Sequence, residues 1–128
     1  MVKKIKIITK ATGAVEAEIT WEKNPKTAEA VWRALPIEAH AATWGDEIYF
    51  PIPVKVGEEN PQETVELGDL GYWPPGNSFC IFFGPTPVSR GDEIRPASPV
   101  NVFGKVVGDP KVFKKVKDGD LIRIDRVE

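Results

Sequence analysis

Apolar and polar residues alternate with a period of two at the start of the chain. Lys and Ile alternate over residues 3–9, and over residues 15–21 Val, Ala, Ile and Trp alternate with Glu and Thr. This period places every second side chain on the same face of a strand, so both stretches are predicted to be half-buried strands. Ala-Thr-Gly at 11–13 lies between them and predicts a hairpin turn.

The spacing of apolar residues changes after this hairpin and predicts a helix. Asn24 followed by Pro25 is typical of a helix start, because Asn favours the N-cap and Pro the first helical position. Ala, Val, Trp and Leu then recur at helical spacing as far as Leu35, and Pro36 ends the helix. Residues 37–44 are rich in alanine, and their pattern does not decide between helix and strand.

Two aromatic-rich strands are expected at the centre of the fold, over residues 70–73 and 79–83. They are separated by Pro-Pro-Gly at 74–76, which no helix could cross because two prolines lack an amide donor. A further strand is predicted over 47–53, and its prolines suit the edge of a sheet or the rim of a barrel.

The last part of the chain adds a long loop, a short helix and two strands. Residues 85–96 are too rich in proline and glycine for regular structure, and long loops of this kind are often functional. Strands are predicted over 99–107 and 120–127, with a short helix from Pro110 that Gly119 stops. A total of seven or eight short strands with two helices predicts a closed or nearly closed antiparallel barrel.

Composition narrows the class of protein and of partner. The 128 residues fit one domain, 1–128, and 17 Lys and Arg against 19 Asp and Glu give no reason to expect a nucleic acid or an anionic membrane as partner. No apolar run approaches the roughly 20 residues of a membrane span, and the start lacks the apolar region of a signal peptide, so we expect a cytoplasmic protein. Abundant Lys and Glu with little Gln and Met are consistent with a thermophilic source.

The sequence contains no motif for a metal or a cofactor, and none is expected. Cys80 is the only cysteine, and its apolar neighbours predict a buried, small hydrophobic side chain. Asp46, Glu47, Asp69 and Glu93 do not have the spacing of metal ligands, so charges at turns and strand edges explain them better than a metal site or a general base.

The aromatic residues are too numerous for the interior of one small barrel. Neighbours on a strand point to opposite faces, so Phe82 and Phe83 cannot both enter the barrel. We therefore expect some of these side chains to line an apolar surface groove that binds a small molecule. The residues predicted to bind it are Glu47, Tyr49, Tyr72, Trp73, Phe79, Phe82 and Phe83.

Several segments resemble the cyclophilins. Residues 99–116 carry Phe-Gly-Lys-Val, then glycine, then a helical pattern, as the penultimate strand and second helix of cyclophilins do, and Gly-Asn-Ser-Phe-Cys-Ile at 76–81 resembles the cyclophilin strand that begins Gly-Ser-Gln-Phe-Phe-Ile. Over nearly the whole chain, the sequence is more similar to a compact family of cyclophilin-like proteins of unknown function from archaea and bacteria. The segments that carry this similarity are 44–50, 68–74, 82–87 and 98–104.

The resemblance implies a mainly β fold, a closed antiparallel eight-stranded barrel with two flanking α-helices, and no settled activity. Together with the predicted aromatic groove, it leads us to expect a site for a small apolar molecule or a proline-containing peptide. Cyclophilins isomerise prolyl bonds with an arginine on a barrel strand, in a Phe-His-Arg setting. The corresponding strand here, residues 47–52, has no basic residue before Lys55, and the glutamine of the cyclophilin pattern falls on Ser78. We therefore expect a binding protein without standard cyclophilin catalysis.

Two alternatives remain open at this point. The protein could be a weak prolyl isomerase in which Arg90 or Arg95, from the long loop, replaces the missing arginine. It could also be an oligomerisation module that hides the groove in a homodimer.

Overall fold

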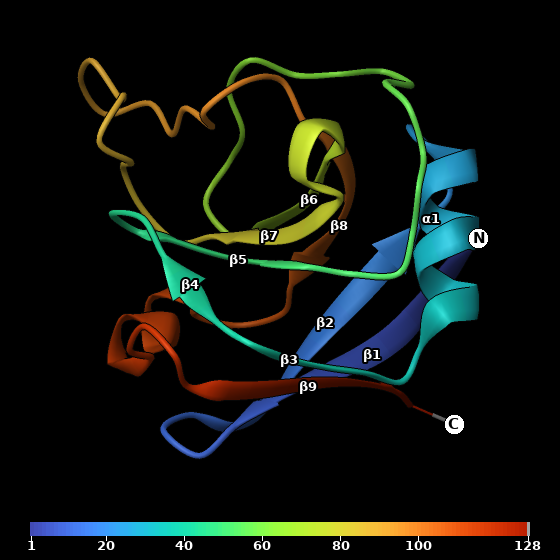
Figure 1. The fold of residues 1–128 in the computed structure, drawn as a ribbon, viewed down its shortest axis with the longest axis horizontal. Coiled ribbons are helices and arrows are strands. Elements are labelled where there is room, and N and C mark those ends of the chain that lie inside the picture. Colours follow the sequence, from blue (N-terminus) through green and yellow to red (C-terminus); the bar gives the residue numbers. More distant parts are fainter. Residues whose placement is uncertain (128) are drawn as a thin grey trace.

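Nine antiparallel strands form one sheet that curls into a nearly closed barrel (Figure 1). The computed structural model describes residues 1–127, and the strand order is β3-β9-β1-β2-β8-β6-β7-β5-β4. The expected mainly β barrel is therefore confirmed. The strands are β1 (Val2–Thr9), β2 (Gly13–Thr20), β3 (Ile37–His40), β4 (Ala42–Thr43), β5 (Glu47–Pro51), β6 (Asp69–Trp73), β7 (Ser78–Phe82), β8 (Asn101–Val106) and β9 (Leu121–Arg126).

The period of two at the start of the chain gives the longest pair of strands. β1 and β2 pair over eight residues each, joined by a turn at Gly13, whose positive φ of 69° favours glycine. Ile5 and Ile7 of β1 are fully buried, whereas Lys6 between them is exposed. The predicted hairpin is thus confirmed.

The two edges of the sheet are formed by neighbouring segments of the chain. β3 pairs with β9 at one edge and β4 pairs with β5 at the other, and only Ala41 separates β3 from β4. The Ala41 N–H donates to the Asp120 carbonyl at 2.8 Å, and the Ala41 carbonyl accepts from the Gly119 N–H at 2.7 Å. The chain therefore passes from one edge of the sheet to the other within a few residues, and this brings the edges together.

The expected count of eight strands is wrong, because this alanine-rich segment supplies two strands. His40 pairs with Leu121, while Ala42 pairs with Tyr49 on the opposite edge. The partners lie far away in the sequence and on different strands, so the local pattern of residues 37–44 could not reveal the division.

α1 (Pro25–Ala34) is the α-helix that the sequence predicts, and it packs against β2 and β8. Its start is held by a distant carboxylate: the backbone N–H groups of Lys26 and Thr27 each donate to Glu59 at 3.1 Å. Asn24 has no capping hydrogen bond and instead donates from Nδ2 to a carbonyl of β8 at 2.7 Å. The helix start was predicted correctly, but the group that caps it was not.

The expectation of two flanking α-helices is also wrong, because the second helical segment is a 3-10 helix, η2 (Pro110–Lys115). The Lys111 N–H donates to the Asp109 side chain at 3.0 Å, and the Val116 N–H donates to the Phe113 carbonyl, three residues back, at 3.0 Å. Six residues are too few to offset the cost of nucleating an α-helix, so the tighter turn persists around the buried Phe113 ring. Among residues 1–127, no helix has the length and apolar character that crossing a membrane requires.

The interior of the barrel is filled by alternate residues of its strands. At its centre Phe79 of β7 stacks on Phe50 of β5 at 5.3 Å between ring centroids, and it meets the edge of Phe103 of β8 at 5.2 Å. All three rings are completely buried. We call these rings, together with the other buried apolar side chains that pack with them, the interior core.

A second, smaller apolar cluster lies apart from the interior core. It is formed by alternate residues of β7 and β8 together with residues of the loops beside them. Tyr49 and Trp73 pack against it and remain partly exposed. The members of this outer cluster are Val65, Cys80, Phe82, Ile94, Val100 and Val102.

Candidate functional site

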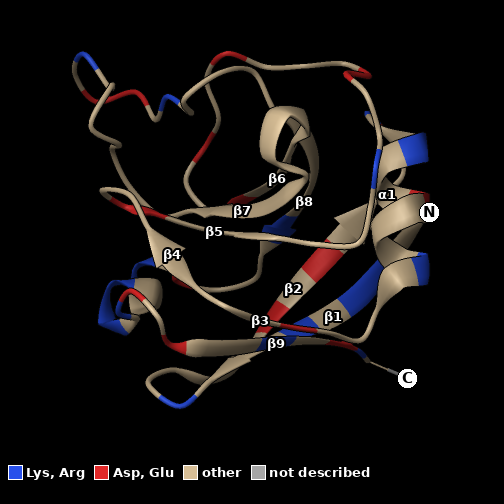
Figure 2. Ribbon diagram, viewed as in Figure 1, with Lys and Arg blue, Asp and Glu red and all other residues tan. Residues whose placement is uncertain are grey.

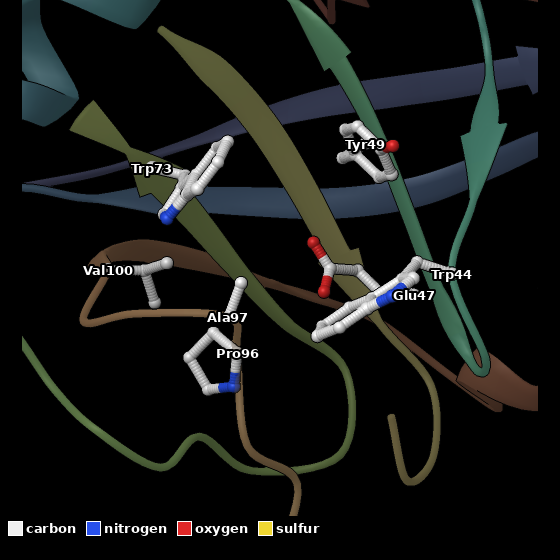
Figure 3. Close-up of a pocket in the computed structure, with 7 residues that line it drawn as sticks. All are labelled: Trp44, Glu47, Tyr49, Trp73, Pro96, Ala97 and Val100. Atoms are coloured by element: carbon white, nitrogen blue, oxygen red, sulfur yellow. The ribbon is translucent and has the colours of Figure 1, made fainter. Parts of the chain in front are cut away.

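A pocket of about 280 Å³ lies over the outer cluster (Figure 3). Two of its residues come from β5, one from the end of β6, one from the turn before β5, and three from the segment that leads into β8. We call it the outer-face pocket. Its lining residues are Trp44, Glu47, Tyr49, Trp73, Pro96, Ala97 and Val100.

The alternation of β5 places two functional side chains in this pocket. Ile48 and Phe50 point into the interior core, so Glu47 and Tyr49 point to the opposite face. β5 pairs with β7, which puts Glu47 opposite Phe82 and Tyr49 opposite Cys80. The buried outer face of β7 therefore lies beside both pocket residues.

Gly71 of β6 allows close packing beneath the pocket. A Cβ atom at this position would lie 3.0 Å from Val100 Cγ2 and 3.3 Å from the Phe82 ring. Cys80 faces Gly71 across the β6–β7 pair and is buried, which confirms the expectation of a small buried side chain. The absence of a side chain at 71 lets Val100 and Phe82 approach each other.

Hydrogen bonds hold the backbone of one pocket tryptophan and the ring of the other. The Trp44 backbone N–H donates to the Glu47 carbonyl at 2.9 Å, which closes the turn before β5. The Trp73 indole N–H donates to Ser98 Oγ at 2.7 Å, which holds the ring against the segment leading into β8. Both rings are partly exposed, so they present apolar surface to the pocket.

Glu47 is the one charged residue among the seven that line the pocket. Its side chain is only 5% exposed, its carboxyl group lies between the rings of Trp44, Tyr49 and Trp73 (Figure 3), and its Oε1 has no hydrogen-bond partner within the described chain. Burial raises the pKa of Glu47 from its ordinary value of 4.5 to about 7, although the Cys80 thiol beside it opposes part of the rise. Both protonation states are therefore populated near neutral pH.

Within residues 1–127, no cationic side chain pairs with Glu47. β5 carries a charge only at its first residue, and β7 carries none (Figure 2). Lys114 of η2 lies near the turn before β5, but its Nζ pairs with Asp46 Oδ2 at 3.7 Å. The carboxyl can accept a hydrogen bond or pair with a cation when ionised, and it can donate a hydrogen bond when protonated.

The aromatic residues predicted to bind a ligand fall into two groups. Tyr49 and Trp73 line the pocket together with Glu47. Tyr72, Phe79 and Phe83 belong to the interior core, whereas Phe82 belongs to the outer cluster beneath the pocket. As expected from their adjacency, Phe82 and Phe83 lie on opposite faces, and Phe83 packs 6.3 Å from the Phe113 ring of η2.

Comparison with known proteins places this chain in a family. A family model described as cyclophilin-like matches residues 3–125, which is nearly the whole chain. The chain belongs to the cyclophilin-like family. No curated protein matches the sequence.

A solved structure of a similar protein agrees with this barrel. The chain is similar to the hypothetical protein AF2241 from Archaeoglobus fulgidus, whose structure was determined in solution. The two sequences are 44% identical, the match covers 98% of this chain and 95% of the other, and the TM-score is 0.83. The resemblance seen in the sequence is thereby confirmed at the level of family and fold.

The two arginines proposed as a substitute for the cyclophilin electrophile do not line the outer-face pocket. The Arg95 side chain is held by Glu93, with Nε donating to Oε2 at 3.2 Å. Arg90 is exposed, and its backbone N–H also donates to Glu93, at 2.9 Å. Glu93 thus holds the Arg95 side chain and the Arg90 backbone within the loop, whereas Pro96, directly after Arg95, reaches the pocket.

Four pocket residues were missing from the sequence prediction: Trp44, Pro96, Ala97 and Val100. A signal existed for Trp44, because a Gly-Asp turn separates it from Glu47 and a turn can return a side chain to the same surface. The other three depend on the path of a loop that no local pattern determines. Within residues 1–127, no three His, Cys, Asp or Glu side chains are grouped so that they could hold a metal ion.

Proposed function

We propose that this cyclophilin-like protein is a ligand-binding protein and that the outer-face pocket is its binding site. The observation that carries the proposal is the buried carboxyl group of Glu47, which has an unpartnered oxygen and faces a pocket that is otherwise apolar and aromatic. Burying a polar atom without a partner costs free energy, and such an atom in a native structure calls for an explanation. A ligand that supplies a hydrogen-bond partner or a counter-charge for this oxygen would explain it.

The shape of the pocket supports a compact ligand. Its volume of about 280 Å³ is at the lower end of the roughly 300–1,000 Å³ typical of small-molecule sites. Three aromatic side chains and one titratable group with a raised pKa are the combination expected of a binding site. A small molecule, or a single residue such as the proline of a peptide, fits this volume better than an extended peptide does.

The four tryptophans of the chain allow a direct test by NMR. Trp44 and Trp73 line the pocket. Trp21 packs elsewhere, against Trp32 of α1, with 6.3 Å between the ring centroids. We expect titration of the ¹⁵N-labelled protein with small soluble compounds and short X-Pro peptides to move the indole N–H signals of Trp44 and Trp73 only. The signals of Trp21 and Trp32 serve as internal controls.

Variants make the same test specific. Tyr49→Ala removes one wall of the pocket, so we expect it to weaken binding of any hit, whereas Leu121→Ala, an exposed apolar truncation on β9, leaves binding unchanged. Hits that move all four indole signals equally, or that bind Tyr49→Ala as well as the parent, would contradict the assignment of the site.

The same labelled sample also tests the alternative function, prolyl isomerisation. Exchange spectroscopy on an X-Pro peptide reports binding and cis–trans interconversion together. Faster interconversion that localises to the pocket would establish an isomerase without an arginine in its pocket, and binding without acceleration would support the proposed binding role.

A further inference from the structure

The chemistry of the outer-face pocket indicates what kind of ligand it takes. Aromatic ring faces carry negative electrostatic potential and attract cations, and Trp and Tyr do so more strongly than other side chains. The pocket combines two tryptophans, Trp44 and Trp73, with Tyr49 around a carboxyl group (Figure 3). Rings and carboxylate favour the same sign of charge in the ligand.

The residues that line the pocket include no positively charged side chain. Of the lining residues, all except Glu47 are uncharged. Lys114 is paired with Asp46, and Arg95 is paired with Glu93. An ionised Glu47, only 5% exposed, is thus left for a cation from outside to neutralise.

We infer that the outer-face pocket binds a small organic cation, with an ammonium group near the Glu47 carboxylate and its apolar substituents between Trp44, Tyr49 and Trp73. This inference rests on the proposed binding function and specifies its ligand class. An anion meets repulsion from both the carboxylate and the ring faces, and a neutral apolar molecule leaves the carboxyl oxygen unpartnered.

The cation requires Glu47 to be ionised, so binding is coupled to loss of its proton. The titratable groups that face Glu47 are the Cys80 thiol of β7 and the Tyr49 hydroxyl of its own strand, and Asp46 and Lys114 pair with each other at the adjacent turn. Burial and the nearby Glu47 raise the pKa of Cys80 well above its ordinary value, so the thiol stays neutral. Affinity for a cation therefore rises with pH as Glu47 ionises.

Three probes of nearly the same shape test the inference: choline, its neutral analogue 3,3-dimethylbutan-1-ol, and the anion 3,3-dimethylbutanoate. Each is titrated into the ¹⁵N-labelled protein, with the Trp44 and Trp73 indole signals as the readout of binding. We expect choline to bind about tenfold more tightly than the alcohol, and the anion to bind most weakly. We also expect choline affinity to increase between about pH 5.5 and about pH 8, because the Glu47 pKa is about 7.

Two variants separate the contributions of charge and rings. Glu47→Gln keeps the size of the side chain and removes its charge, so it should reduce choline affinity much more than the affinity of the alcohol, and it should remove the pH dependence of choline binding. Trp73→Leu keeps Glu47 and removes one aromatic wall, so it should weaken choline more than the alcohol.

The outcomes distinguish this inference from the function on which it rests. If the alcohol or the anion binds as tightly as choline at these tryptophans, the pocket is a binding site but the cation assignment is wrong. If none of the three probes moves the Trp44 and Trp73 signals, the cation assignment is also overturned. The proposed function fails separately, when the wider set of compounds and X-Pro peptides gives no hit at the pocket either.

Discussion

The interior core and the outer-face pocket use alternate residues of the same strands, yet they treat polar groups differently. Inside the barrel, Tyr72 is completely buried and its hydroxyl donates to the Val54 carbonyl at 2.6 Å and accepts from Asn77 Nδ2 at 2.8 Å. Outside, Glu47 is nearly as buried, but its Oε1 has no partner within residues 1–127. On the inner face, the protein itself supplies hydrogen-bond partners for the buried tyrosine hydroxyl. On the outer face, the described residues leave one oxygen of a buried carboxyl group without a partner.

The largest expected contrast is between truncations on the two faces. Phe79→Ala removes a ring that contacts Phe50 and Phe103, so we expect it to lower the free energy of unfolding by about 3–5 kcal/mol. Tyr49→Ala removes a partly exposed ring from the pocket and should cost less than about 1 kcal/mol. Urea denaturation monitored by circular dichroism measures both, and equal losses would show that the pocket wall belongs to the stabilising core.

The second contrast concerns pH and isolates Glu47. Its pKa is raised from 4.5 to about 7 in the folded protein, so between these values the native state holds a proton that the unfolded state has released. Protonated Glu47 therefore makes its full contribution to the free energy of unfolding below about pH 4.5. The free energy of unfolding then falls by on the order of 3 kcal/mol as the pH rises to about 7 and beyond.

Glu47→Gln should remove this dependence. We expect the variant to match the parent near about pH 4.5 and to be more stable by on the order of 3 kcal/mol near about pH 8. The exposed substitution Glu58→Gln is the matched control and should leave the difference near zero. If the free energy of unfolding of the parent and of Glu47→Gln changes with pH in the same way, then ionising Glu47 costs no free energy in the folded protein.

The smallest contrast is between the two tyrosine hydroxyls. Tyr72→Phe leaves the Val54 carbonyl and the Asn77 amide without their buried partner, and we expect a loss of about 1–3 kcal/mol. Tyr49→Phe is the matched control on the other face and should change stability by less than about 0.5 kcal/mol. If thermal unfolding shows the same small change for both variants, the interior hydroxyl network contributes less than its geometry suggests.

Much of the fold follows from local pattern, because periodicity reports which side of a strand is buried. The β1–β2 hairpin, the start of α1 at Pro25 and the two strands β6 and β7 were all predicted from residues close together in the sequence. What failed depends on distant partners: β3 and β4 are separate strands because β9 and β5 pair with them, and Glu59 caps α1 from a loop that carries no helical signal.

The candidate site was predicted in part, for the same reason. Glu47 and Tyr49 share a face of β5, and alternation alone brings them together. Sequence could not decide which strand faces were outside, so Tyr72 and Phe79, which lie in the interior core, were grouped with Trp73, which lies in the pocket. The walls contributed by Pro96, Ala97 and Val100 depend on the folded path of residues 96–100, between the long loop and β8.

The short strand β4 connects the pocket to one edge of the sheet. Only two residues, Ala42 and Thr43, join this edge of the sheet to β5, and the next contact along the chain is the Trp44 N–H on the Glu47 carbonyl. The side chains of both residues line the pocket, although the contact itself joins backbone atoms. A ligand that touches both side chains would bind the form in which this turn is closed, so its binding would stabilise the turn and the short β4–β5 pairing against local opening.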